Sequence, residues 1–476
     1  MKKLDRRWKV LLVTSVAVFM GFLDVTIVNV AFPGIRHAFP EASVAGLSWV
    51  LNAYNIVFAA LLVPAGRLAD LVGRRRLFFV GFGLFLAASA ACGLAPSVDV
   101  LVAARVVQAA GAALLMPTSL GLVLPEFPPE RRGSATALWA ATGAVAAATG
   151  PSLGGVLIHW TDWRVVFFVN LALGAAALVP ARRLLREIRD PDRGAVPDAL
   201  GIALLAGGVA ALALAIVEAP DWGWGSDRVI AAFAAAALAL AAFVRRSAVH
   251  PHPVVELSLF RVRAFALSCA GVAIFSLGFY ALLLSNILFL TGVWHYSILR
   301  AGFAVTPGPL MAALSSALAG RMIDRFGQRV SAVPGGILFA LGCGAFATGL
   351  GAEPAYLTAY LPGTVLTGTG VGLSFAGFSS ATVMNLPPAR YSTGSAIASC
   401  FRQIGAVVGI AVLIALLGAA PGLADFQTAW WLMAATGVTA ATVALGLRRA
   451  TVPAWTSKSA ASTTPSPAAA RSAARS

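Results

Sequence analysis

The sequence predicts an all-α integral membrane protein with about 14 transmembrane helices, and its composition and patterning both support this fold class. Of the 476 residues, 59% are hydrophobic and only 11% are charged, whereas soluble domains average about 25% charged residues. The apolar residues form long continuous runs rich in Ala, Leu and Gly, without the alternation typical of a membrane β-barrel. These features exclude a soluble enzyme, a disordered chain and, with only 4 Cys, a disulfide-stabilised secreted domain.

The apolar runs are long enough to cross the ~30 Å hydrocarbon core of a bilayer as helices. The first run follows a basic N-terminus, but it is too long for a signal peptide and lacks a cleavage site, so we expect a retained first helix. The expected spans are residues 10–33, 47–66, 77–95, 99–124, 134–158, 164–182, 199–219, 228–245, 264–292, 301–322, 330–350, 355–384, 392–418 and 427–447.

The basic residues indicate how the spans are oriented. The net charge is +16, and most of the 35 Lys and Arg residues lie in alternate loops on the side of the N-terminus. Cytoplasmic loops of membrane proteins carry such an excess, so we expect both termini to be cytoplasmic. Trp49, Trp160 and Trp294 lie at the opposite ends of their spans, as in an interfacial aromatic belt. A membrane surface, rather than nucleic acid, therefore accounts for the positive charge.

A loop motif occurs twice, and its second copy begins 254 residues after the first. Glycine lets helix ends approach closely, and aspartate accepts charge-assisted hydrogen bonds, so the motif could latch the cytoplasmic ends of two halves and gate the pathway. Alternatively, it is only a cluster of positive charge without a mechanical role. The copies contain Gly66, Arg67, Asp70, Gly73 and Arg75, and Gly320, Arg321, Asp324, Gly327 and Arg329.

The repeat divides the chain into two pseudo-repeat halves. We expect an N-terminal six-helix half at residues 1–185 and a C-terminal six-helix half at 251–449. Residues 186–250 form a linker with two inserted helices, and 450–476, rich in Ser, Ala, Thr and Pro, form a disordered cytoplasmic tail. Repeated halves are a transporter architecture, with the binding site between them near the membrane midplane.

Asp24 is the one acid deep inside an expected span, and its position suggests a function. An ionised carboxylate in hydrocarbon is costly, so such residues usually face a cavity. At 1.5 Å per residue, Asp24 and Arg105 lie at similar depth and could pair directly or through water. The pair then either couples proton movement to transport, because wetting of the cavity controls protonation of Asp24, or forms a static bridge between helices.

Other polar residues in the spans are candidates for contacting a substrate. Arg402 lies near the midplane, where it could bind an anionic or polar substrate group or could pair with helix dipoles and carbonyls. The remaining side chains could instead hydrogen-bond neighbouring helices. The substrate-cavity candidates are Asn29, Asn55, Gln108, Tyr280, Asn286, Arg402 and Gln403.

The expected fifth span contains a glycine- and proline-rich kink. Proline frees a backbone carbonyl and bends a helix, and paired glycines allow close helix approach. This kink either seals the pathway against proton leak or is a packing feature, and the two hypotheses are compatible. Its residues are Gly150, Pro151, Gly154 and Gly155.

Together, these motifs resemble the major facilitator superfamily, in particular its fourteen-helix drug:proton antiporters. The resemblance extends to about residue 447. Two positions depart from the family pattern, because Ala109 and Ala146 stand where the family usually has glycine. The matching segments are Leu23-Asp24-x-Thr26-Ile27-Val28-Asn29-Val30-Ala31-x-Pro33, the repeated loop, Arg105-x-x-Gln108, Gly150-Pro151-x-x-Gly154-Gly155, Trp163-Arg164-x-x-Phe167-Phe168-x-Asn170 and Ser399-x-x-Arg402-Gln403-x-Gly405.

The resemblance implies a proton-coupled secondary active transporter that exports hydrophobic or amphipathic small molecules by alternating access. We expect a monomer in the bacterial plasma (inner) membrane, whose partners are a lipophilic small-molecule substrate, protons and membrane lipids, but not nucleic acid. The sequence contains no ATP-binding or hydrolase motif, so we expect neither an enzyme nor a cofactor. It also indicates no metal site, since His250 and His252 lie among cytoplasmic charges.

Two alternatives remain open. The protein could be a dedicated exporter or importer of one metabolite, such as an amino acid, a siderophore or a lipid. It could also be a membrane sensor that transports nothing, but the intramembrane Asp24 and the absence of a soluble domain disfavour this alternative.

Overall fold

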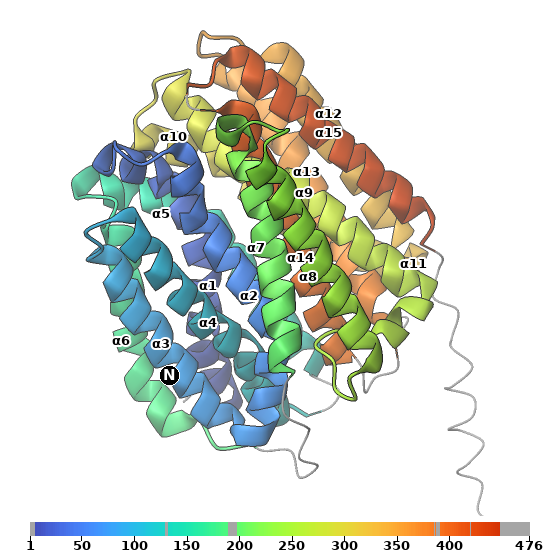
Figure 1. Cartoon of the computed structure of the whole chain (residues 1–476). Coiled ribbons are helices and arrows are strands. Elements are labelled where there is room, and N and C mark those ends of the chain that lie inside the picture. Colours follow the sequence, from blue (N-terminus) through green and yellow to red (C-terminus); the bar gives the residue numbers. More distant parts are fainter. Residues whose placement is uncertain are drawn as a thin grey trace, which may run out of the picture.

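The computed structural model describes residues 5–128, 132–188, 198–384, 386, 391–418 and 420–447, and this part of the chain is helical without strands (Figure 1). The all-α prediction is therefore confirmed. The predicted disordered tail lies outside the described residues.

The first eight long helices run from the N-terminus to residue 249. They are α1 (Arg6–Ala38), α2 (Val44–Val72), α3 (Arg74–Gly93), α4 (Val98–Val123), α5 (Arg132–Trp160), α6 (Val165–Leu184), α7 (Ala199–Trp222) and α8 (Asp227–Val249), with the 3-10 turn η1 (Leu124–Glu126) after α4.

The rest of the described chain begins with a second 3-10 turn and continues with helices. They are η3 (Leu257–Arg261), α9 (Arg263–Gly292), α10 (Ile298–Val305), α11 (Pro307–Phe326), α12 (Arg329–Gly349), the π-helix η4 (Tyr356–Tyr360), α13 (Leu361–Met384), α14 (Tyr391–Leu417) and α15 (Leu423–Leu445).

Within the described residues, 12 helical segments are long and apolar enough to cross a membrane. α10 and α11 together form one of them, Ile298–Ile323. Two other helices, α5 and α13, contain 29 and 24 residues and coincide with two further expected spans. The multi-pass membrane fold is confirmed, and the count of fourteen stays a prediction.

Side-chain caps define where several helices begin. The hydroxyls of Ser43, Ser97, Ser226 and Ser297 accept hydrogen bonds from backbone N–H groups in the first turns of α2, α4, α8 and α10. Such caps satisfy donors that have no partner within the helix. The sequence thus encodes the helix starts locally.

Asp198 caps α7 and also pairs with the next helix. Its carboxylate accepts from Gly201 N at 3.0 Å and from Arg246 Nε, near the end of α8, at 2.6 Å. Burial alone would raise the pKa of Asp198, but the hydrogen bonds from Gly201 and Arg246 outweigh it and lower that pKa below its usual value. The ion pair therefore joins the ends of the α7–α8 hairpin.

The helices pack in two groups. In the first, α1 packs against α4, α5 and α6, while α4 also packs against α2 and α3. In the second, α12 packs against α13 and α15, and α9 packs against α14 and α15. The groups meet where α2 contacts α14 and where α5 contacts α10 and α11. The residue boundaries of the predicted halves are not tested by this packing and stay a prediction.

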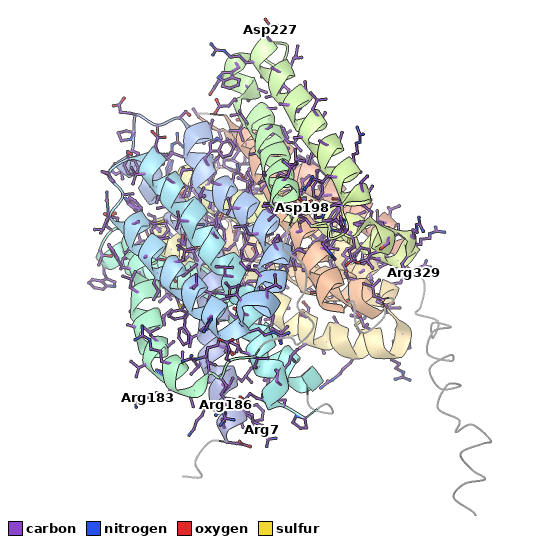
Figure 2. All side chains as sticks on the ribbon, turned by 60° about the horizontal axis from the view of Figure 1, so that its bottom comes forward. Arg7, Arg183, Arg186, Asp198, Asp227 and Arg329 are labelled. Atoms are coloured by element: carbon purple, nitrogen blue, oxygen red, sulfur yellow. The ribbon has the colours of Figure 1, made fainter. Side chains whose placement is uncertain are left out.

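The hairpin of α7 and α8 lies over the seam between the groups. α7 packs against α2 and α14 as well as against α8, and Figure 1 shows the green α7 between the blue and the orange helices. Arg7, Arg183 and Arg186 lie together at one end of the bundle, and Asp227 lies at the other (Figure 2). The beginning of α1 and the end of α6 are therefore on the same side.

Large apolar side chains cover the outer surface of the bundle. Leu12, Val80, Leu238 and Leu341 are each more than half exposed. A monomeric soluble protein rarely exposes extended apolar patches, whereas hydrocarbon solvates them well. The outer surface is therefore suited to contact with lipid.

Candidate functional site

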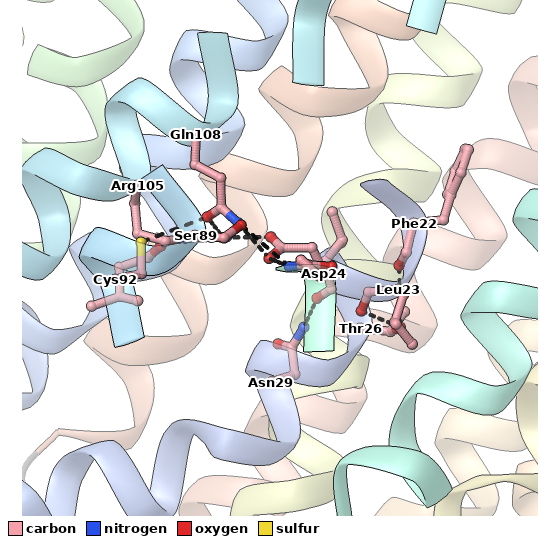
Figure 3. A network of polar contacts seen from close by, with 12 residues as sticks. Phe22, Leu23, Asp24, Thr26, Asn29, Ser89, Cys92, Arg105 and Gln108 are labelled. Carbon is pink, nitrogen blue, oxygen red and sulfur yellow. Dashed lines mark hydrogen bonds and ion pairs between the residues drawn. The ribbon is translucent and has the colours of Figure 1, made fainter. Parts of the chain in front are cut away.

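A buried ion pair lies at the centre of the first helix group. Asp24 of α1 and Arg105 of α4 are 0% and 1% exposed, and Arg105 Nη1 donates to Asp24 Oδ2 (Figure 3). The depth estimate from sequence favoured this pairing. Its role in proton coupling is not tested by the geometry and stays a prediction.

Gln108, one turn after Arg105 on α4, joins both members of the pair. Its Nε2 donates to Asp24 Oδ1 at 2.8 Å, and its Oε1 accepts from Arg105 Nη1 at 2.6 Å. The spacing of three residues places both α4 side chains on one face of the helix. Gln108 was a candidate for the substrate cavity, and its hydrogen bonds place it in the ion-pair network.

Two residues that were not among the predicted site residues complete the network. Asn170 Nδ2 of α6 donates to Asp24 Oδ1 at 3.3 Å, and Ser89 Oγ of α3 accepts from Gln108 Nε2 at 2.8 Å. Both are fully buried. Asn170 ends a segment that resembles the family pattern, which was the available sequence signal. The carboxylate of Asp24 thus has three side-chain donors from α4 and α6.

Arg105 is also anchored to α2. Its Nε donates to Val50 O at 3.0 Å, and its Cζ lies 4.1 Å from the ring centroid of Tyr54. An aromatic face stabilises a desolvated cation. The guanidinium is therefore held at the junction of α1, α2 and α4.

A central cavity adjoins this network. It is small, about 10 Å³, which is room for about one water molecule. Its walls come from α1, α2 and α4 of one helix group and α9 and α14 of the other. Its lining residues are Val25, Asn29, Leu51, Tyr54, Asn55, Arg105, Tyr280 and Ile410. Arg105, a member of the ion pair, and Tyr54, whose ring contacts it, both line this cavity. The ion pair therefore forms part of the cavity wall.

Three predicted candidates, Asn29, Asn55 and Tyr280, line the central cavity. The side-chain oxygens of Asn29 and Asn55 are buried and have no hydrogen-bond partner. Buried polar atoms are nearly always paired, so these two oxygens are available to a water molecule or a ligand. The arrangement can therefore bind a donor group beside Arg105.

The other three candidates lie away from this cavity. Asn286 and Gln403 are 8% and 4% exposed, and each has a buried side-chain oxygen without a hydrogen-bond partner. Neither lines the central cavity. Arg402 lines a second hollow, bordered by α9, α13 and α14.

The kink residues of α5 face two neighbouring helices. A Cβ at Gly154 would lie 2.7 Å from Ile27 Cγ1 of α1, and one at Gly155 would lie 3.2 Å from Ile298 O of α10. Gly302 of α10 packs in turn against Pro151 O. The glycines thus let α5 touch both helix groups at once, at the end of the bundle that the sequence predicts to be extracellular.

The repeated loops show the same backbone feature in both copies. Gly73, at the end of α2, has φ 115°, and Gly327, at the end of α11, has φ 89°. Residues with a side chain rarely adopt a positive φ of this size, which explains why glycine stands at both positions. The side chains of Arg67, Asp70 and Asp324 lie outside the described residues, so their predicted part in a latch is not visible.

The described contacts of the first loop stay within its own helix group. Glu187, which follows α6, accepts from Arg75 N at 3.0 Å and from Arg76 N at 3.3 Å. The guanidinium of Arg75 donates to Arg182 O at 3.4 Å. The second-copy residues Arg321 and Arg329 are exposed, Gly320 has open space around it, and Gly66 packs near Pro117.

Comparisons with known proteins agree with this architecture. The sequence profile of the Major Facilitator Superfamily matches residues 14–267 and 267–476. The chain is 35% identical over 410 residues to Multidrug resistance protein Stp of Mycobacterium tuberculosis (strain CDC 1551 / Oshkosh), covering 86% of this chain and 75% of that protein. It is 32% identical over 422 residues to the Tetracenomycin C resistance and export protein of Streptomyces glaucescens, covering 88% and 77%.

A solved structure shares the fold. It is that of a bacterial homologue of the human drug peptide transporters PepT1 and PepT2, with a TM-score of 0.66 over 93% of this chain and 98% of that chain. The sequence identity is 15%, so this likeness concerns the fold alone.

Proposed function

Because the chain belongs to the major facilitator superfamily of membrane transporters, we propose that it exports hydrophobic or amphipathic small molecules in exchange for protons. Relatives that cover most of its length are named for multidrug resistance and for antibiotic resistance and export. The proposed location is the inner membrane of a bacterium, with both termini in the cytoplasm. α5 and α13 then bring the number of spans to fourteen.

The observation that carries the proposal is the position of Asp24 beside the central cavity. Asp24 is a buried, titratable group, and its partner Arg105 lines the cavity wall. An ionised Asp24 neutralises Arg105, whereas a protonated Asp24 leaves the guanidinium without a counterion. A proton on Asp24 therefore changes the charge that a molecule in the cavity meets.

The exchange of substrate for protons follows from this effect of the Asp24 proton on the cavity. When the cavity faces the outside, a proton binds Asp24, and the uncompensated charge of Arg105 disfavours the apolar part of the bound molecule beside it. When the cavity faces the cytoplasm, an apolar group beside Arg105 favours the neutralised ion pair, so Asp24 is ionised and the proton leaves. Asn29, Asn55 and Tyr280 are the proposed substrate contacts, because each lines the cavity.

Alternating access requires that the two helix groups separate at one end at a time. In the predicted orientation, the contacts of Gly155 with α10 and of Gly302 with Pro151 close the extracellular end. The repeated loops are the corresponding gates at the cytoplasmic end, where Gly73 and Gly327 each follow a helix with a positive φ. We infer that a monomer suffices, since cavity and ion pair lie within one chain.

A transport assay in everted membrane vesicles tests the proposal. Wild-type protein is expected to accumulate a fluorescent lipophilic dye when respiration energises the vesicles, and a protonophore should abolish this accumulation. Asp24→Asn should abolish it at equal expression. Asp99→Asn removes the same charge from an exposed position on α4 and should leave transport intact.

Two outcomes would contradict the proposal in different ways. If Asp24→Asn transports as wild type does, the Asp24–Arg105 pair is a structural bridge. If the wild-type protein moves none of a panel of chemically varied lipophilic dyes, the protein is assigned as a transporter dedicated to one metabolite instead of a drug exporter.

A further inference from the structure

A second hollow, here called the Arg402 recess, lies between α9, α13 and α14. Its volume is about 40 Å³. It lies in the part of the bundle nearest the connection between α13 and α14, which the sequence predicts to be cytoplasmic. Its lining residues are Val272, Ser379, Thr382, Ser395, Ala398, Ser399 and Arg402.

Charge in the recess is unbalanced. Arg402 is its one charged lining residue among those described, and the Nε of Arg402 is buried without a hydrogen-bond partner. Guanidinium groups stay protonated in proteins, so the charge cannot be removed by titration. A cation within a membrane-spanning bundle is expensive unless a counter-charge or polar partners surround it.

The guanidinium of Arg105, the other arginine within a span, has hydrogen-bond acceptors around it. Arg105 has the carboxylate of Asp24, the amide oxygen of Gln108 and the carbonyl of Val50 as acceptors. Among the described residues that line the recess of Arg402, none carries a carboxylate or a side-chain amide. The recess offers donors, from the guanidinium and from three serine hydroxyls, and lacks an anion.

We propose that the Arg402 recess binds an oxyanion group of the exported molecule, so that acidic amphiphiles carrying a carboxylate, sulfonate or phosphate are its preferred substrates. This inference rests on the proposed export function. The fork of N–H donors on a guanidinium matches two oxygens of such a group. The hydroxyls of Ser395 and Ser399, one helical turn apart on α14, can donate to the remaining oxygen.

The apolar body of the ligand has a place beside the recess. Tyr280, which lines the central cavity, and Val272, which lines the recess, lie about two turns apart on α9. The ring of Tyr280 lies 5.2 Å from that of Phe279, which lies 5.3 Å from that of Phe375. An amphiphile with its anionic group at Arg402 can therefore extend along aromatic surface towards the central cavity.

Two probes that differ only by a sulfonate test the proposal. 8-Anilinonaphthalene-1-sulfonate and N-phenyl-1-naphthylamine share the same aromatic body, and both fluoresce on binding. Binding is measured to the full chain in nanodiscs of phosphatidylcholine, with empty nanodiscs as the background. Arg402→Gln should weaken binding of the sulfonate about tenfold or more, because a hydrogen-bonded charge pair is lost.

Matched variants separate an anion site from a structural role. N-Phenyl-1-naphthylamine should bind Arg402→Gln within about twofold of wild type, since no charged contact changes. Arg402→Lys should retain most of the sulfonate binding, and Arg261→Gln, at an exposed position, should retain all of it. Equal sulfonate binding by wild type and Arg402→Gln, or equal losses for both probes, would overturn the proposal.

A lipid headgroup carries the same chemistry and is tested in a separate arm. Phosphatidylglycerol in the nanodiscs should leave sulfonate binding to the wild type unchanged within about twofold. Competition by this lipid would assign the recess to a headgroup and overturn the substrate assignment. Failure of the export function is distinguishable, because both probes would still bind while neither moved with a proton gradient in proteoliposomes.

Discussion

The side-chain amide of Gln108 donates to Asp24 at 2.8 Å, while its oxygen accepts from Arg105, so one amide touches both members of the buried ion pair. An amide can do this because it carries a donor and an acceptor at opposite ends. Gln108 thereby fixes the orientation of both charged groups without adding a charge.

Replacing Gln108 should therefore impair transport even though it carries no charge. Hydrogen bonds to charged groups contribute about 1.5–3 kcal/mol each, so Gln108→Leu should lower the rate of proton-driven dye efflux about tenfold. Gln427→Leu, at a half-buried position on α15, should have no effect. Initial efflux rates at equal expression give the comparison, and an unaffected Gln108→Leu protein would remove this residue from the coupling network.

The ring of Tyr54 should matter more than its hydroxyl. The guanidinium of Arg105 lies 4.1 Å from the ring centroid, and cation–π contacts contribute about 0.5–2 kcal/mol. Tyr54→Leu should slow efflux about 2- to 30-fold, whereas Tyr54→Phe should stay close to wild type. A phenylalanine variant as impaired as the leucine variant would show that the hydroxyl, not the ring, is required.

Gly302 should be necessary for closing the end of the bundle where α5 meets α10. A methyl group at Gly302 would overlap Pro151 O, so Gly302→Ala should hold the helix groups apart at that end. The cavity position Asn55→Cys then reports the opening through its reaction with a membrane-impermeant maleimide added from outside. All four native cysteines are buried, which keeps the background low.

The expected result is faster labelling in the Gly302→Ala background and slower dye efflux. Gly83→Ala is the control, because a Cβ there meets nothing within 4 Å. Unchanged labelling in the Gly302→Ala protein would show that this contact does not close the extracellular end.

The Asp198–Arg246 pair should make the stability of the α7–α8 hairpin depend on pH. The pKa of Asp198 lies below its ordinary value of 3.8 in the folded protein. Its stabilising contribution is therefore fully present above pH 3.8 and is lost as the pH falls through the folded pKa. Asp198→Ala should cost about 1 kcal/mol at neutral pH through loss of the helix cap alone.

Thermal unfolding of the detergent-solubilised protein measures this effect. The melting temperatures of wild type and Asp198→Ala should differ at pH 7 and converge at pH values well below 3.8. A difference that stays constant down to such acidity would mean that the carboxylate charge does not contribute. Asp5→Ala, at an exposed position before α1, is the matched control.

The site was only partly predictable from the sequence. Asp24, Arg105 and Gln108 stood out because charged or polar residues are costly within apolar spans. Ser89, Tyr54 and Asn170 are just as buried and contact the same network, but each is compatible with ordinary helix packing. Their contacts with the network depend on which helix faces which, and a single sequence carries no signal for that.

The sequence by itself determined the class of the protein. Long apolar runs, with few charges and a repeated loop motif, require helices that satisfy their own backbone hydrogen bonds in lipid. Only the tertiary structure decided that Gln108 turns to the ion pair rather than to the cavity, and that Arg402 faces a recess without an anion. Helix formation is local, whereas the partners of a buried polar group come from helices distant in the chain.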